Sequence, residues 1–173
     1  MSLYKPFPKF IPRPLIVICV CLFIAFWLTA MTTALTGALC TNPDRPAEKR
    51  LRGCNISIPL GKLIPGDGHK RGSVYLERGI IRANMGETEL ARADMAEALD
   101  RATYGEPHRA IQMWGESVRQ TQQTMRDRDK GSRLYRRNPG IWFARLFERI
   151  QAEPQGSPAK RIWAEFVIKA EGG

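Results

Sequence analysis

A stretch of 25 residues, 15–39, carries no charged side chain and constrains the fold of this chain more than any other feature. A helix needs about 20 predominantly apolar residues to cross the hydrocarbon core of a bilayer. The stretch therefore predicts a transmembrane helix or signal-anchor. A cleaved signal peptide is the alternative, with Thr32, Thr33 and Ala34 as the cleavage region, but its apolar part would be shorter.

Basic residues lie on both sides of this stretch, so charge alone leaves its orientation open. Lys5, Lys9 and Arg13 favour a cytoplasmic N-terminus. Cys40 and Cys54 bracket a short loop on the other side, and in an oxidising compartment they would form a disulfide worth about 3 kcal/mol. The alternative is two free thiols. We expect a single-pass protein of a bacterial inner (cytoplasmic) membrane, with a cytoplasmic arm at residues 1–14 and its C-terminal domain in the periplasm.

Small side chains recur along the second half of the apolar stretch. Such spacing lets another helix approach closely in a membrane. The alternative is that small residues mark the end of the span. The candidate residues for transmembrane helix packing are Ala30, Thr33, Ala34, Gly37 and Ala38.

Residues 40–71 predict a proline- and glycine-rich connector that holds the disulfide. Prolines at positions 43, 46, 59 and 65 interrupt any long helix. We expect at most one helical turn here, at residues 47–52.

Residues 72–102 predict two amphipathic helices joined by a turn at Gly86. In the first helix, apolar and small residues recur at three- and four-residue spacings, and the second repeats the pattern. The inward positions of the first helix are Tyr75, Leu76, Gly79, Ile80 and Ala83, and those of the second are Leu90, Ala91, Met95, Ala98 and Leu99. Small residues on both sides predict close antiparallel packing.

This hairpin resembles a tetratricopeptide repeat, a helix-turn-helix unit of about 34 residues with large and small residues at fixed positions. The residues at the family's packing positions are Tyr75, Gly79, Gly86, Ala91, Met95 and Ala98. Two positions depart from the pattern, because Arg82 replaces an aromatic residue and Thr103 replaces the closing proline. The resemblance implies a protein-interaction scaffold. The preceding cysteine pair is similar to that of exported bacterial repeat proteins.

Further helices must cover a single repeat, since one repeat cannot bury both of its faces. We expect a capping helix at residues 107–127 and two more amphipathic helices in the C-terminal part. Phe143, Leu146, Phe147 and Ile150 form the apolar stripe of one, and Ile162, Trp163, Phe166 and Val167 that of the other. We interpret these stripes as core, with docking on a partner or on the membrane as the alternative. The predicted fold class is mainly α: a transmembrane helix followed by a small repeat-like helical domain at residues 72–173.

The chain carries 27 basic and 17 acidic residues, with one local basic concentration. That concentration is either a solvated helix end and loop or a contact for anionic lipid or an acidic partner. Its members are Arg126, Arg128, Lys130, Arg133, Arg136 and Arg137. No motif for nucleic acid accompanies it.

No motif for a catalytic, metal or cofactor site is present in the sequence, so we expect neither an enzyme nor a cofactor. The chain has two histidines, and no Cys/His cluster has metal-ligand spacing. The function predicted is a membrane-anchored scaffold or assembly factor that binds another membrane or envelope protein. The alternative is a small accessory subunit of a larger membrane complex, held by its span.

Overall fold

The computed structural model describes residues 13–64, 71–107 and 139–171. Within these residues the chain is mainly helical, with six helices and no strand. The predicted capping helix and the basic concentration around residues 126–137 lie outside the described residues.

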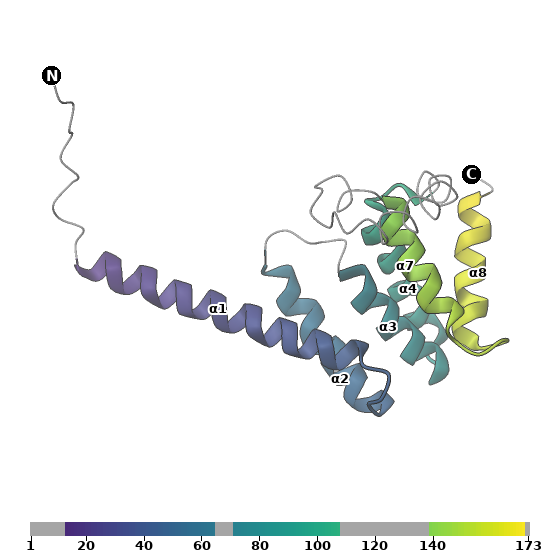
Figure 1. Cartoon of the computed structure of the whole chain (residues 1–173), viewed down its shortest axis with the longest axis horizontal. Helices are drawn as coiled ribbons and strands as arrows, with labels where there is room; N and C mark the ends of the chain where they lie inside the picture. The colour runs from purple at the N-terminus through teal and green to yellow at the C-terminus, as the bar shows by residue number, and fades with distance from the viewer. Residues whose placement is uncertain (1–12, 65–70, 108–138, 172–173) are drawn as a thin grey trace, which may run out of the picture.

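Helix α1, Arg13–Thr41, projects from the rest of the molecule at its N-terminal end (Figure 1). Side chains 14–28 are all exposed, as a lipid-facing helix requires. Of the helices that the structure describes, only α1 is long and apolar enough to cross a membrane, and its candidate span is Pro14–Thr41. At 1.5 Å per residue its 28 residues extend about 42 Å, longer than the hydrocarbon core of about 30 Å. The surplus carries several threonines, whose hydroxyls donate to carbonyls four residues earlier.

Helix α2, Ala47–Lys62, occupies most of the expected connector. Pro46 stands at its N-cap, where a missing N–H costs nothing. Pro59 lies inside the helix and removes one backbone hydrogen bond, which ordinarily costs about 3 kcal/mol or more. The helix persists because its Gly53, Ser57, Ile58 and Gly61 face is buried in the structure. The expectation of a connector with one helical turn is therefore wrong.

Helices α3, Arg71–Asn84, and α4, Thr88–Thr103, form the predicted hairpin. Gly86 has a φ of 83°, a left-handed conformation that glycine adopts without strain. The amides of Gly86 and Glu87 bond to the carbonyls of Ala83 and Arg82, the pattern that closes a helix with a glycine turn. Leu90 is half exposed rather than inward-facing, since it lies on the outer side of the first turn of α4.

Helices α7, Pro139–Gln151, and α8, Pro158–Glu171, pack against this hairpin (Figure 1). The interpretation of their apolar stripes as core is correct for the side chains that the structure describes, which leave out Val167. Phe147 and Phe166 are partly buried against the core, and the others are buried: Phe143, Leu146, Ile150, Ile162 and Trp163. The large buried side chains of the shared core include Leu76, Met95, Phe143 and Trp163, and the core extends to Ile58 of α2. The hairpin α3–α4 is thus covered on both sides, by α2 and by the α7–α8 pair.

Candidate functional site

A glycine of α2, Gly53, lets the domain approach the backbone of α1 closely. A Cβ atom on Gly53 would lie 2.9 Å from the Thr36 carbonyl oxygen and 3.0 Å from the Cys40 amide nitrogen. One turn later, the Ser57 hydroxyl donates to the Thr33 carbonyl oxygen at 3.3 Å. A Cβ on Gly61 would lie 3.8 Å from Cγ2 of Thr33. Helix α2 therefore returns antiparallel along the last turns of α1.

This contact uses part of the small-residue face predicted for packing with another helix. Thr33 and Gly37 lie against α2 of the same chain. Ala30 is half-buried at the same interface, whereas Ala34 and Ala38 remain exposed. Helix α2 of the same chain therefore packs on part of this face, and the packing of another helix on its exposed part stays a prediction.

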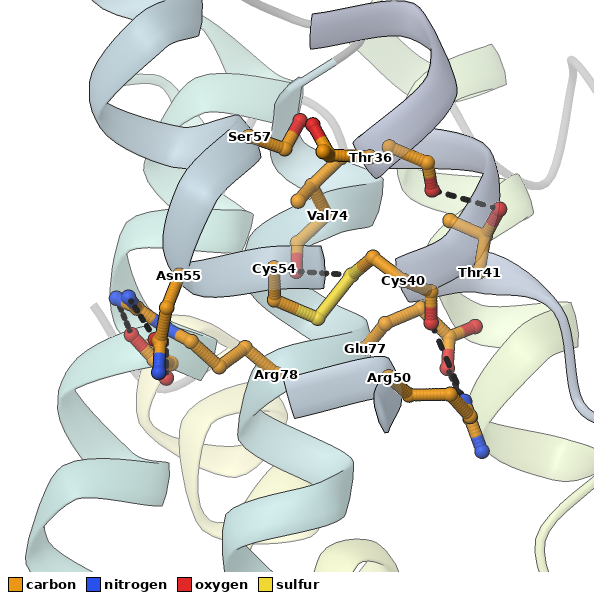
Figure 2. The surroundings of a disulfide bond; sticks show 12 residues. Thr36, Cys40, Thr41, Arg50, Cys54, Asn55, Ser57, Val74, Glu77 and Arg78 are labelled. Carbon is orange, nitrogen blue, oxygen red and sulfur yellow. Dashed lines mark hydrogen bonds and ion pairs between the residues drawn. A yellow bond between two sulfur atoms is a disulfide. The ribbon is translucent and has the colours of Figure 1, made fainter. Parts of the chain in front are cut away.

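Cys40 and Cys54 form the predicted disulfide, with Cα atoms 4.8 Å apart (Figure 2). Both residues are completely buried and pack with Ile81 of α3. The bond joins the last turn of α1 to the middle of α2. Because α3 covers it, α1, α2 and the hairpin meet at one junction.

A buried carboxylate ties this junction to the far side of the domain. Glu77 on α3 is 4% exposed and accepts hydrogen bonds from Arg50 of α2 and Arg149 of α7. The Arg50–Glu77 bond is 2.6 Å long, and Arg50 also donates to the Cys40 carbonyl oxygen at 3.2 Å (Figure 2). Burial alone would lower the pKa of Arg149, but its bonds and attraction to Glu77, then Glu153, raise that pKa above its ordinary value.

A second buried carboxylate joins the two helices of the hairpin. Asp94 on α4 accepts hydrogen bonds from Arg78 at 2.6 and 2.9 Å and from Arg82 at 2.8 Å. Arg78 also donates to Asn55 of α2 at 3.1 Å. The arginine at position 82, which departs from the repeat pattern, therefore bonds across the hairpin where the family has an aromatic residue.

Sequence reasoning missed both carboxylates. The available signal was an acidic residue at a position whose helical neighbours are apolar or small, as Asp94 stands between Ala91 and Ala98. Such a residue is expected to be buried only when a cation reaches it. The cations come from other helices, and their positions are set by the fold.

The residues at the predicted repeat-packing positions lie together between α3 and α4, except Gly86, which is exposed in the turn that joins the two helices. Tyr75, Ala91, Met95 and Ala98 are buried. A Cβ on Gly79 would lie 2.9 Å from Cγ of Met95 and 3.3 Å from the Ala91 carbonyl oxygen. The two helices are therefore in close contact at Gly79.

Two of the grooves on the described surface are lined in part by α3. One, of about 350 Å³, lies between α1, α2 and α3 and is lined mainly by small and apolar side chains, with Arg71 at its edge. The other, of about 270 Å³, lies between α3, α4 and α7. Leu76 and Leu146 line it together with Trp142, Arg145 and Arg149.

Comparison with protein-family models, curated proteins and solved structures gave no match. The resemblance to the tetratricopeptide repeat thus rests on the pattern of residues in α3 and α4. Among the described residues, no group of three or more His, Cys, Asp or Glu side chains is placed to hold a metal ion. What the described arrangement does physically is hold a helical domain in a fixed position at the end of an apolar helix.

Proposed function

We propose that this protein is a membrane-anchored scaffold or assembly factor that presents its helical domain to another envelope protein, outside the cytoplasm. The observation that carries the proposal is the junction at Cys40, Cys54 and Gly53. A flexible tether would let the domain turn freely above the bilayer. Here the last turns of the anchor helix pack within the domain. The orientation of the domain relative to the span is therefore fixed.

The repeat-like hairpin supports a role in protein binding. Tetratricopeptide repeats are interaction modules, and stacked helix pairs create concave surfaces that receive peptides or helices. The groove between α3, α4 and α7 has an apolar floor at Leu76 and Leu146 and arginines beside it. It suits a partner segment that offers an apolar side chain.

The disulfide supports a periplasmic domain, because disulfides persist in oxidising compartments. The basic arm before the span points to the same orientation. The proposed location is therefore the inner membrane, crossed once, with α2–α8 on the periplasmic side.

A span-exchange experiment tests the scaffold against its alternative, an accessory subunit held by its transmembrane helix. The exposed Ala34 and Ala38 favour the alternative, since they leave a small-residue surface open to another helix. Residues 15–28 are replaced by an unrelated apolar sequence, and the exposed Ala34 and Ala38 are each replaced by leucine. Thr33, Thr36 and Gly37, which contact α2, are kept. A scaffold retains the partner that co-purifies with the wild type. Loss of that partner, with the domain still folded, would favour the accessory subunit.

The partner surface is tested separately with a photo-activatable amino acid. Ser73 lines the groove between α3, α4 and α7 and has an exposed side chain, so a photo-cross-linker there should capture the partner. Glu89, whose side chain is 91% exposed, serves as the control outside the groove. Equal capture from both positions, or capture of only the same chain at Ser73, would contradict this assignment.

A further inference from the structure

The C-terminal part of α2 exposes apolar side chains although the helix belongs to the domain. Ile58 faces the core, but Ile56 and Leu63 are 40% and 69% exposed, and Leu60 is half-buried. Single exposed apolar residues are ordinary on a protein surface. Ile56, Leu60 and Leu63 recur at four- and three-residue spacings along one side of the helix. They form an apolar strip that ends at Leu63.

The register between α1 and α2 locates this strip relative to the bilayer. Gly61 lies beside Thr33, and the groove between the helices is lined by both Ile64 and Ala30. Helix α1 opens with Arg13 and Pro14, so its apolar part begins at Leu15. Twenty helical residues from Leu15 end at Ala34 and extend about 30 Å. The last turn of α2 is therefore level with the part of α1 that reaches the outer edge of the hydrocarbon core.

Two basic residues stand at the same level. Lys62 is exposed in the last turn of α2, where its long aliphatic stem can lie along apolar surface while its ammonium group stays polar. Arg71, the first residue of α3, lines the same groove as Ala30 and Thr33 and donates a hydrogen bond to the Ile64 carbonyl oxygen. Basic groups at the same level as the end of an apolar strip match the anionic surface of a bilayer.

We propose that residues 60–64, at the end of α2, are seated in the interfacial layer of the membrane beside α1. Leu63 lies among the acyl chains, and Lys62 and Arg71 lie at the headgroup phosphates. The proposal rests on the proposed membrane span of α1. A span alone leaves the domain free to tilt on the bilayer, whereas this second contact on a different helix fixes its tilt. The partner surface of the domain is then presented at a defined angle to the membrane.

A depth measurement on the full-length protein tests the proposal. The disulfide protects two of the four cysteines, and Cys19→Ser with Cys21→Ser removes the remaining thiols. A single new cysteine is then introduced as Leu63→Cys, Leu22→Cys or Glu48→Cys, each at an exposed position, and labelled with an environment-sensitive fluorophore. The proteins are reconstituted in vesicles of phosphatidylcholine and phosphatidylglycerol. Quenching by doxyl-labelled lipid is compared with quenching by iodide in the water.

The label at position 63 should lose its fluorescence to doxyl lipid and resist iodide, as the label at position 22 in the span does. The label at position 48, at the other end of α2, should respond to iodide only. Quenching of position 63 by iodide, or by neither reagent, would overturn the interfacial seat while position 22 still reported the span. If position 22 itself escaped doxyl quenching, the span would fail, and the seat with it.

Discussion

Gly53 of α2 lies directly against the backbone of Thr36 in α1, so closely that a Cβ atom on the glycine would approach the Thr36 carbonyl oxygen to 2.9 Å. The two nearest neighbours of that atom, the Thr36 carbonyl oxygen and the Cys40 amide nitrogen, are backbone groups of one helix. They cannot rotate away as a side chain would. The attachment of the domain to its anchor therefore depends on the absence of a side chain at this position.

We expect Gly53→Ala to destabilise the protein, although alanine is the better helix former by about 1 kcal/mol. The added methyl group must separate α1 from α2, and overpacking of this kind costs about 1–3 kcal/mol. The same change at Gly61 is the matched control, because there the nearest atoms to a Cβ are 3.5 Å away on the Arg71 side chain. Thermal unfolding of the full-length protein in detergent should show a lower Tm for Gly53→Ala and an equal or higher Tm for Gly61→Ala. Equal loss at both glycines would contradict the register.

The hairpin is tested by Ala91→Leu and Ala93→Leu, which place the same side chain at two nearby positions of α4. Ala91 is completely buried and its carbonyl lies beside Gly79, whereas Ala93 is exposed. Overpacking at position 91 should cost about 1–3 kcal/mol, and the exposed change should stay within about 0.5 kcal/mol. The measurement is denaturant unfolding followed by circular dichroism. Comparable losses would mean that the faces of α4 are wrongly assigned.

The disulfide is expected to form in cells and to stabilise the junction. Peptides from unreduced protein should show Cys40 linked to Cys54 by mass spectrometry, and Cys54→Ser should lower stability by about 3 kcal/mol. Reducing agent should destabilise the wild type and leave the variant unchanged. Recovery of both cysteines as free thiols after rapid alkylation of cells would contradict the pairing.

Removing the carboxylate of Glu77 should destabilise the protein more than removing a carboxylate on the surface. Glu77→Gln leaves Arg50 without its carboxylate and removes one of the two acidic partners of Arg149, and breaking a buried pair costs about 3–5 kcal/mol. Glu165→Gln is the control, since its ion pair with Arg92 lies on the surface, where such pairs contribute about 0–1 kcal/mol. Chemical denaturation of the two variants measures the difference. A Glu77→Gln protein as stable as the control would show that the two arginines are satisfied in another way.

Topology is expected to place α2–α8 outside the cytoplasm. A reporter that is active only in the periplasm, fused after Gly173, should be active, and a cytoplasmic reporter at the same position should be silent. The opposite pattern would overturn both the orientation and the compartment in which the disulfide was argued to form.

Several elements were accessible from local pattern. The apolar stretch predicted α1, because the absence of charge over this length has few other physical explanations. The hairpin followed from helical periodicity and the turn glycine, and the apolar stripes of α7 and α8 from the same periodicity. The cysteine pair was indicated by its position beside the span. Whether the hairpin belongs to the tetratricopeptide repeats stays a prediction.

Other features were decided by the tertiary structure. Pro59 locally disfavours a helix, yet α2 forms because burial against α1 and the core offsets the lost hydrogen bond. The small residues of α1 left open whether another helix packs on them, and the tertiary structure places α2 against Thr33 and Gly37. From the sequence, Glu77 and Asp94 would be assigned to the surface. In the structure both are buried, because arginines donate hydrogen bonds to them. In each case the deciding interaction joins residues far apart in the sequence. The sequence by itself determined only what neighbouring residues impose on one another, namely the length of the apolar helix, the helical periods and the glycine turn.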